Sequence, residues 1–204
     1  MAKFQIRVEN SAPSQTQPAQ SAEWAAKIFY DSGARRIVDL GCGRLRNLPV
    51  FMKYFNDITL VDTKFQFDRI RDIIPKSKNI IFLTLDEFAK SRTPYDGVFC
   101  ISVLHIMPYV GTRRNLIKTS HSVLKNDGLI LVDVPTHETY YARRCNEENQ
   151  HLDGWVMGKG QYRTFYKNFT AKQIDDFIRK SASFQKIDAN SQIKHVTRIF
   201  KKMT

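Results

Sequence analysis

The stretch Val38-Asp39-Leu40-Gly41-Cys42-Gly43 decides the fold of this chain. An apolar segment runs there into two glycines that are one residue apart, ahead of a segment with helical spacing. Glycine has no Cβ, so the main chain can turn sharply and a ligand can lie directly against it. An apolar strand that ends in such a turn is typical of open α/β sheets, which bind ligands beyond the carboxyl ends of their strands.

Further apolar runs follow this one, and stretches long enough to form helices separate them. The runs cover residues 37–40, 58–61, 79–83, 97–101 and 129–132, and the stretches between them include 48–55 and 113–124. Runs that are apolar on both faces are expected for parallel strands with helices on both sides. The alternation predicts a doubly wound α/β sheet that is mostly parallel.

The end of the chain adds a different unit to this sheet. Thr170 can cap a helix over residues 171–180. Two strand-like stretches, 183–189 and 194–200, are joined by a short connection and predict a C-terminal antiparallel hairpin. The expected sheet is therefore seven-stranded, with helices on both faces.

The domain organisation that we expect is a single domain over residues 1–204. Residues 1–17 contain few apolar anchors and are expected to form a mobile lead-in. A helix is expected over residues 19–32, with Gly33 at its C-terminal cap. Residues 135–168 show no clear period, are rich in polar and aromatic side chains, and are expected to form an insertion after the fifth strand.

Composition narrows the class of protein. Hydrophobic residues make up 42% of the 204 residues, and no apolar run approaches the roughly 20 residues that span a bilayer. The first ten residues lack the apolar core of a secretory signal, so a soluble, cytoplasmic protein without a membrane partner is expected. Three widely spaced cysteines, Cys42, Cys100 and Cys145, argue against a disulfide framework and a zinc site.

The net charge of +12 favours an anionic partner without choosing among nucleic acid, an acidic small molecule and a membrane surface. Half of this charge lies in the last third of the chain, where 13 basic and 7 acidic residues follow from Pro135 onward.

Two acidic residues stand where an adenosine-containing ligand would need them. Asp62 ends the second apolar run, 21 residues after Gly41, and can accept hydrogen bonds from both hydroxyls of a ribose. Asp86 follows the third run and can accept a hydrogen bond from an adenine amino group. The sequence therefore predicts an adenosine-type ligand at the carboxyl edge of the sheet.

The glycine spacing separates two classes of such ligand. A dinucleotide fingerprint would need glycine at position 46, where a bulky arginine, Arg46, would obstruct the pyrophosphate. With Asp39 ahead of the glycines, the pattern Asp-x-Gly-x-Gly resembles motif I of the class I S-adenosylmethionine-dependent methyltransferases, which have a Rossmann-like fold. The resemblance runs from about Ala19 to Phe200 and includes the terminal hairpin.

The resemblance implies a transferase that uses S-adenosyl-L-methionine, with a role for each matching residue. Asp39 would orient the amino group, and Asp62 would hold the ribose. The other cofactor-binding residues that it implies are Gly41, Cys42 and Gly43 for the methionine portion, Leu85 and Asp86 for the adenine, and Ile101 and Ser102 for the sulfonium region. The family often has a third glycine where this chain has Leu45, so the pocket for the methionine portion is expected to differ in shape there.

His105 follows the fourth strand by four residues and is the catalytic candidate, either as a general base or as a group that orients the substrate. The other histidines have no spacing that suggests metal ligands. Surface positions are expected for them: His121, His137, His151 and His195.

The insertion carries aromatic side chains interleaved with cations, and in this family such an insertion commonly covers the active site. The substrate-side candidates are Tyr141, Arg144, Tyr162, Arg163 and Tyr166. Aromatic residues can shape a pocket, and arginines can hold a carboxylate or phosphate. The same mixture can stack bases and contact a phosphate backbone, or it can form a solvated loop packed on the domain.

Which acceptor is methylated depends on the segment after the fourth strand. Cys100-Ile101-Ser102-Val103 lacks the Pro-Pro-aromatic motif of amino-directed DNA methyltransferases, and Phe99 stands where cytosine-C5 enzymes have proline. We therefore expect methyl transfer to the oxygen or nitrogen of a small or medium-sized, anionic acceptor, by alignment and desolvation. The alternatives are an RNA-modifying methyltransferase that uses the basic C-terminal third, and a non-catalytic interaction module with the same fold.

Overall fold

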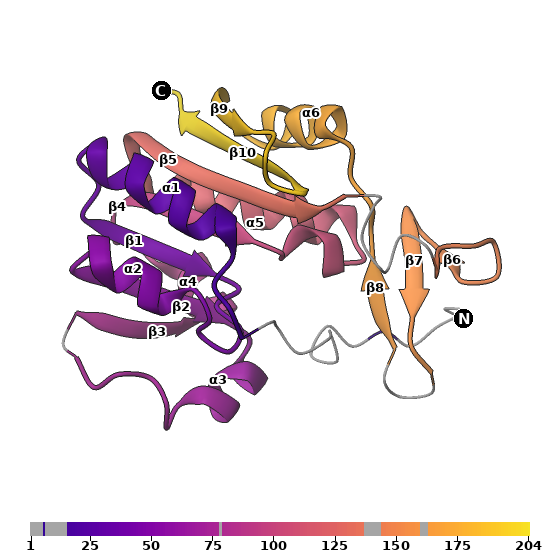
Figure 1. The fold of residues 1–204 in the computed structure, drawn as a ribbon, viewed down its shortest axis with the longest axis horizontal. Helices are drawn as coiled ribbons and strands as arrows, with labels where there is room; N and C mark the ends of the chain where they lie inside the picture. The colour runs from indigo at the N-terminus through magenta and orange to yellow at the C-terminus, as the bar shows by residue number, and fades with distance from the viewer. Residues whose placement is uncertain (1–5, 7–15, 78, 137–143, 160–162) are drawn as a thin grey trace.

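The computed structural model describes residues 6, 16–77, 79–136, 144–159 and 163–204, and Figure 1 shows how their elements are arranged. The helices are α1 (Gln20–Asp31), α2 (Leu48–Tyr54), α3 (Lys64–Ile70), α4 (Leu85–Lys90), the 3-10 helix η2 (Leu104–Ile106), α5 (Val110–Val123) and α6 (Ala171–Ser181). The strands are β1 (Arg36–Leu40), β2 (Asp57–Asp62), β3 (Ile80–Thr84), β4 (Tyr95–Ile101), β5 (Leu124–Pro135), β6 (Gln150–His151), β7 (Gly154–Met157), β8 (Thr164–Tyr166), β9 (Phe184–Asn190) and β10 (His195–Lys202).

Seven strands form one sheet in the order β3-β2-β1-β4-β5-β10-β9. The first five strands in this order pair in parallel, and β10 pairs antiparallel with both β5 and β9. The predicted seven-stranded, mostly parallel sheet with a C-terminal antiparallel hairpin is confirmed. The carboxyl ends of the parallel strands share one edge, because Leu40 pairs with both Val61 and Cys100.

Two apolar clusters fill the two faces of the sheet. One cluster joins α1 and α2 to one face and contains Phe29, Phe51 and Phe99. The ring centroid of Phe99 lies 4.5 Å from that of Phe29 and 4.4 Å from that of Phe51. The other cluster joins α4, α5 and α6 to the opposite face. Figure 1 shows this layering, with α1 and α2 on one side of the strands and α5 on the other. The apolar runs of the sequence are thus buried from both sides, as expected for a doubly wound sheet.

Residues 125–128 have the composition of a turn, Lys-Asn-Asp-Gly, but they are part of β5. Leu124 pairs with Tyr95 and Leu129 pairs with Gly97, so residues 125–128 bulge opposite Asp96. The Asp96 carboxylate accepts hydrogen bonds from the main-chain N–H groups of Arg35 and Arg36, at 2.9 and 2.8 Å. Residues 125–128 shift the register between β4 and β5 without ending β5, as a bulge does.

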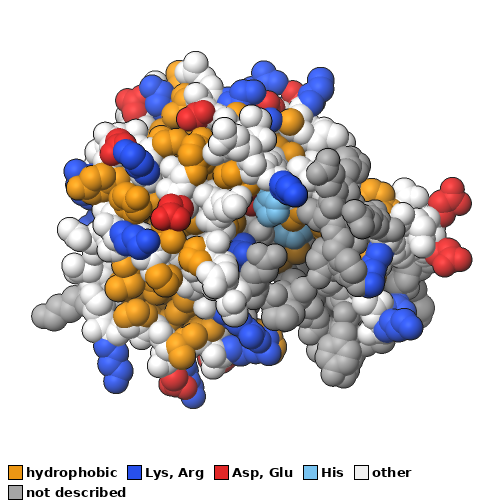
Figure 2. Space-filling view, viewed as in Figure 1, with side chains coloured by type: hydrophobic (Ala, Val, Ile, Leu, Met, Phe, Trp, Pro, Cys, Tyr) orange, Lys and Arg blue, Asp and Glu red, His pale blue; other side chains and the backbone are white. Residues whose placement is uncertain are grey.

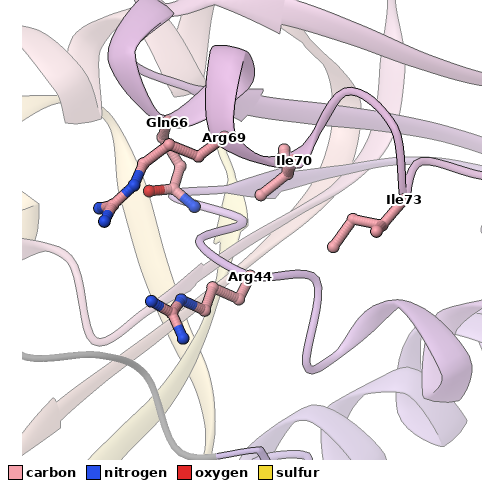
Figure 3. A pocket seen from close by; sticks show the side chains of 5 residues that line it. All are labelled: Arg44, Gln66, Arg69, Ile70 and Ile73. Atoms are coloured by element: carbon pink, nitrogen blue, oxygen red, sulfur yellow. The ribbon is translucent and has the colours of Figure 1, made fainter.

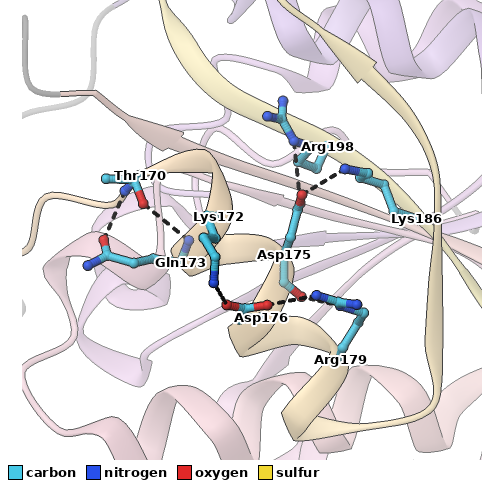
Figure 4. A network of polar contacts seen from close by, with 8 residues as sticks. All are labelled: Thr170, Lys172, Gln173, Asp175, Asp176, Arg179, Lys186 and Arg198. Carbon is cyan, nitrogen blue, oxygen red and sulfur yellow. Dashed lines mark hydrogen bonds and ion pairs between the residues drawn. The ribbon is translucent and has the colours of Figure 1, made fainter.

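Helix α6 is tied to the terminal hairpin by charge as well as by apolar contacts (Figure 4). Thr170 and Gln173 form a reciprocal capping box at its first turn, which confirms the cap read from the sequence. The Asp175 carboxylate faces the Lys186 ammonium of β9 at 2.7 Å and the Arg198 guanidinium of β10 at 3.4 Å. These contacts fix α6 across β9 and β10.

The insertion contains a second sheet, of three antiparallel strands in the order β6-β7-β8. The sequence showed no period there, because strands of two to four residues are too short to display an alternation. Figure 1 shows this small sheet beyond the carboxyl ends of the large sheet. The Lys167 N–H donates to the His105 carbonyl at 2.7 Å, so the small sheet is joined to the segment after β4.

Asp153 anchors the small sheet to α5. The Arg113 guanidinium is 1% exposed and donates to both carboxylate oxygens of Asp153, each at 2.6 Å. The Lys167 ammonium approaches the same carboxylate at 3.4 Å.

Among the described residues, no helix combines the length and apolar character that a membrane span would need.

Candidate active site

The loop after β1 is built on glycines that adopt a backbone conformation closed to most residues. Gly41 has a φ of +76° and Gly43 a φ of +54°. A Cβ on Gly41 would lie 2.4 Å from Cγ2 of Val103, so the loop after β1 passes directly against the segment after β4. The N–H groups of Gly41 and Cys42 both donate to the Val61 carbonyl, at 2.7 and 3.1 Å. The tight bend predicted from the sequence is therefore present.

Leu45 occupies a left-handed position in the same loop, with a φ of +65°, and is 7% exposed. This conformation costs a non-glycine residue on the order of 1 kcal/mol. Burial of the side chain in the cluster beneath α1 and α2 offsets that cost. This explains how the chain does without a third glycine at a position where the backbone conformation favours one.

Asp62 lies at the end of β2 and faces the glycine loop. Its Oδ2 accepts from the Gly43 N–H at 2.9 Å, and its Oδ1 accepts from the Thr63 N–H at 2.7 Å. Burial raises the pKa of the Asp62 carboxyl, and these two hydrogen bonds oppose the rise. The Thr63 side chain also hydrogen-bonds to this carboxylate. A carboxylate has about four lone-pair positions, so at least one stays available to a hydroxyl donor of a ligand.

Asp39 is 1% exposed, and its Oδ2 is buried without a hydrogen-bond partner in the described part of the chain. Burial, with the nearby Asp62 carboxylate adding to it, raises the pKa of Asp39 to about 7, whereas the Arg46 charge acts to lower it. A buried polar atom without a partner is costly to the fold. Such an atom beside a glycine loop fits a site that receives a donor from a ligand.

The remaining predicted cofactor residues lie at the carboxyl ends of β3 and β4. Leu85 and Asp86 begin α4, with Leu85 half-buried and Asp86 exposed. Ile101 ends β4 and is buried, and Ser102 follows with a φ of +59°. The parallel register therefore brings the predicted residues to one edge of the sheet.

His105 lies in η2 beneath the small sheet and is 8% exposed. Its ring meets the Tyr166 ring edge-on at 5.7 Å, and its Nδ1 is buried with no hydrogen-bond partner in the described residues. Burial lowers the pKa of His105 to about 3; the Asp133 carboxylate opposes this shift, and His195 and Arg46 add to it. The ring therefore stays neutral at physiological pH, so it can orient a ligand but binds a proton weakly.

The described substrate-side candidates differ in how far they are exposed. Tyr166 is 2% exposed, and its hydroxyl donates to the Thr136 carbonyl at 3.4 Å, so it lies beside His105 instead of lining an open surface. Arg144 is exposed and Arg163 is half-buried. Tyr141 and Tyr162 lie outside the described residues, as does most of the expected lead-in at 1–17.

Three residues of this edge were missed in the sequence analysis. Arg46, seen there only as an obstacle to a dinucleotide, is close enough to Asp39 and His105 to shift the pKa of each. Asp133, a lone acid inside an apolar strand, is fully buried and binds the ring of His195 at 2.8 Å. The side chain of His195 is half-exposed, and its ring is bound to this buried carboxylate. Figure 2 shows histidine atoms in the middle of one face of the molecule.

A cavity of about 250 Å³ lies between the loop after β1 and α3. It is lined by Arg44, Gln66, Arg69, Ile70 and Ile73. In Figure 3 the two arginines and Gln66 lie together on one side of it, with the isoleucines on the other. The Gln66 Nε2 donates to the Gly43 carbonyl at 2.7 Å, so this cavity adjoins the glycine loop.

Comparison with known proteins places the chain in a family. Residues 14–179 match the model of a methyltransferase domain family. The chain therefore belongs to the methyltransferase family, as the sequence pattern predicted. A protein of Escherichia coli (strain K12), the uncharacterised YmfD, is 26% identical over 173 residues, which cover 79% of this chain and 76% of YmfD.

Solved structures share the fold. The 1,6-didemethyltoxoflavin-N1-methyltransferase of Burkholderia thailandensis, solved with 1,6-didemethyltoxoflavin and S-adenosylhomocysteine, is similar with a TM-score of 0.63 and 16% identity, over 91% of this chain and 79% of that one. The N-methyltransferase NodS of Bradyrhizobium japonicum WM9, solved with S-adenosylhomocysteine, is similar with a TM-score of 0.64 and 10% identity, over 96% of this chain and 94% of NodS. The class I, Rossmann-like methyltransferase fold is thus confirmed.

Proposed function

We propose that this protein transfers a methyl group from S-adenosyl-L-methionine to an oxygen or nitrogen of a small or medium-sized acceptor. One observation carries the proposal: the buried Oδ2 of Asp39, which has no partner among the described residues, and the carboxylate of Asp62 flank the loop that contains Gly41 and Gly43. These groups fit the amino group, ribose and methionine chain of the cofactor. Membership of the methyltransferase family supports the same choice.

Each residue of this pocket would have a separate task. Asp62 would accept hydrogen bonds from the ribose hydroxyls, and Asp39 would orient the amino group. The main chain of Gly41, Cys42 and Gly43 would lie against the methionine portion, since glycines at 41 and 43 leave the main chain uncovered by side chains. Leu85 and Asp86 would flank the adenine, and Ile101 and Ser102 would face the sulfur.

When it is bound, the cofactor supplies a methyl group on a positively charged sulfur. The chain itself would supply alignment and exclusion of water, which can lower a bimolecular barrier by several kcal/mol. His105 would orient the acceptor as a neutral ring. Arg144 and Arg163 would attract an anionic group of the acceptor, and Tyr166 would hold His105 in place; Tyr141 and Tyr162 stay predictions.

The basic charge keeps an RNA acceptor as the second candidate. On the face shown in Figure 2, Lys and Arg side chains are scattered among acidic, polar and apolar ones. A continuous basic stripe is the usual footprint of a backbone-binding surface. This scattering favours the small acceptor on that face.

Calorimetry with S-adenosylhomocysteine, followed by a radiolabelled methyl-transfer assay, tests the proposal. We expect one binding site per chain, weakened by Asp62→Ala, and transfer of label to a small acceptor. A folded protein that does not bind the cofactor would favour a non-catalytic interaction module. Transfer only to RNA, with binding that weakens steeply with salt, would establish the RNA reading.

A further inference from the structure

A buried carboxylate lies on β5, one strand away from the proposed sulfur position. Asp133 is 0% exposed. Its Oδ2 accepts from the Thr197 hydroxyl at 2.7 Å, and its Oδ1 contacts the His195 Nδ1 at 2.8 Å. The carboxylate oxygen accepts from Nδ1 when His195 is the Nδ1–H tautomer. The lone pair of the neutral ring is then on Nε2.

The strand register places this pair at the active-site edge. Asp133 pairs with Ile101 across β4 and β5, and with Thr197 across β5 and β10. The Ser102 N–H donates to the Asp133 carbonyl at 2.8 Å. Cross-strand partners point to the same face of a sheet, so the side chains of Asp133 and His195 lie on the face that carries Ile101.

His195 is accessible where Asp133 is not. Its side chain is 32% exposed, and within the described residues its Nε2 forms no hydrogen bond. The ring is therefore held at one nitrogen by the buried Asp133 carboxylate, and its other nitrogen has no partner in the part of the chain that the structure describes. Enzymes use a histidine that is oriented by a carboxylate in this way to remove a proton from a substrate.

We propose that His195 is the proton acceptor of the methyl-transfer site, oriented by Asp133 and Thr197, and that the acceptor molecule carries a hydroxyl or an N–H that must lose its proton. This rests on the proposed function above. His195 is the catalytic residue in this scheme, and Asp133 and Thr197 are positioning residues. Acceptors that are already anionic, such as carboxylates and thiolates, would have no need of such a base.

Methyl transfer in this scheme forms one bond, breaks one bond and moves one proton. The acceptor's oxygen or nitrogen lone pair forms a bond to the methyl carbon, and the carbon–sulfur bond breaks with its electron pair left on sulfur, which becomes neutral. The acceptor's proton passes to the Nε2 of His195. The resulting imidazolium would be stabilised by the Asp133 carboxylate, which already contacts its Nδ1.

His105 is less suited to this task, although it is nearer in sequence to β4. Its ring is enclosed by Tyr166 and buried, and burial lowers its pKa to about 3. Among the described residues, the charged and titratable groups that act on His105 at this part of the edge are Asp133 from β5, His195 from β10 and Arg46 from the loop after β1.

The test uses a panel of small acceptors: a phenol, a heteroaromatic N–H compound, a carboxylic acid and a thiol. We expect transfer of radiolabelled methyl only to the phenol or the N–H compound. His195→Gln should lower kcat by about 100-fold or more, the usual contribution of a general base, with an unchanged cofactor Kd. The limb of the pH–rate profile that reports a base should disappear, and Asp133→Asn should reproduce part of the loss.

The matched control is His121→Gln. His121 is likewise held at one ring nitrogen, by the main-chain carbonyl of Ser183 at 3.2 Å, but it lies beside the start of β9, at the opposite end of the terminal hairpin. We expect this variant to keep wild-type kcat. Proton NMR of the free protein adds a readout without turnover: a far-downfield Nδ1–H resonance, lost in His195→Gln and Asp133→Asn and kept in His121→Gln.

Three results would overturn the proposal: wild-type kcat in His195→Gln, no transfer to any hydroxyl or N–H member of the panel by protein that binds the cofactor, or no downfield resonance. Loss of cofactor binding itself is a separate result, because it contradicts the proposed function and is measured by calorimetry before any acceptor is added.

Discussion

The carboxylate of Asp62 accepts a hydrogen bond from the main-chain N–H of Gly43 at 2.9 Å. This single contact joins the end of β2 to the loop after β1, and therefore joins the two signals that the sequence placed 19 residues apart. It also orients the carboxylate, because its Oδ1 is fixed in turn by the Thr63 N–H. The site is thus assembled by main-chain donors before any ligand arrives.

Asp62→Ala should weaken the binding of S-adenosylhomocysteine by about 1.5–3 kcal/mol, the range for hydrogen bonds to a charged group. Part of this loss will come from release of the Gly43 N–H. Asp62→Asn keeps one acceptor oxygen and should lose less. Calorimetry measures both, and equal affinity in wild type and Asp62→Ala would remove Asp62 from the pocket.

Gly41→Ala should destabilise the fold by two separate effects. The left-handed backbone costs a non-glycine residue about 1–2 kcal/mol, and the new Cβ would clash with Val103, which adds about 1–3 kcal/mol. Gly33→Ala is the matched control, since Gly33 also has a positive φ, of +88°, but open space around it. Urea unfolding should show a larger loss of stability for Gly41→Ala than for Gly33→Ala. In a Val103→Ala background this extra loss should shrink, because the side chain that clashes with the new Cβ has been shortened. Equal losses at the two glycines would refute the close approach.

Asp39 should make cofactor affinity depend on pH. With a pKa of about 7, about one chain in eleven has this carboxylate ionised at pH 6, against most chains at pH 7.5. If the ionised form binds the cofactor's amino group, the affinity for S-adenosylhomocysteine should rise by up to about tenfold over this range. Asp39→Asn should abolish the rise, and a pH dependence that survives in Asp39→Asn would show that another group causes it.

The same shift predicts the opposite trend for the stability of the free protein. Because the pKa of Asp39 is raised on folding, its contribution to the free energy of unfolding is full below about pH 4 and is lost as the pH rises to about 7. The loss is on the order of 4 kcal/mol. Thermal unfolding of wild type and Asp39→Asn across this range should therefore diverge as the pH rises, with the wild type becoming relatively less stable.

His105→Ala should slow turnover while leaving cofactor affinity unchanged, since the ring lies beneath the small sheet beside Tyr166. His105→Gln, which keeps a hydrogen-bonding group, should retain more activity than His105→Ala. Steady-state kinetics on an identified acceptor measure this, and full activity in His105→Ala would exclude a role in orienting the acceptor.

Asp153→Asn should destabilise the fold by about 3–5 kcal/mol, because it leaves the buried Arg113 guanidinium without its anion. Arg113→Met combined with Asp153→Asn should recover much of this loss. Lys27→Ala is the control, since Lys27 and Asp31 form an exposed pair that contributes little to stability. A loss in Asp153→Asn no larger than that of the control would show that the pair does not anchor the small sheet.

The sequence predicted the sheet and the cofactor edge because both depend on local signals. The apolar runs, the glycines at 41 and 43 and the acid at 62 each report a requirement of the backbone at their own position. Because β1, β2 and β4 pair in parallel, the residues at their carboxyl ends meet at one edge of the sheet. The extension of β5 back to Leu124 was not predicted, because the turn residues 125–128 carry the signal of a chain reversal and form a bulge instead.

The polar pair at the other end of the edge depends on long-range pairing. Asp133 and His195 are 62 residues apart in sequence, and their contact exists only because β10 pairs antiparallel with β5 in one register. The one local sign was an acidic residue inside an apolar strand. A buried carboxylate needs a hydrogen-bond partner, but the sequence does not show which residue that partner is. The small sheet was missed for a related reason, since its anchor, Asp153, binds an arginine on a helix that precedes it by 40 residues.

A crystal structure of the protein soaked with S-adenosylhomocysteine tests the central claim most directly. Density should run from the main chain of Gly41 and Gly43 to Asp62, with the ribose hydroxyls on the Asp62 carboxylate and the amino group facing Asp39. A pocket that stays closed at saturating ligand, with the side chains of Leu45 or Arg46 filling the space beside the glycines, would contradict it.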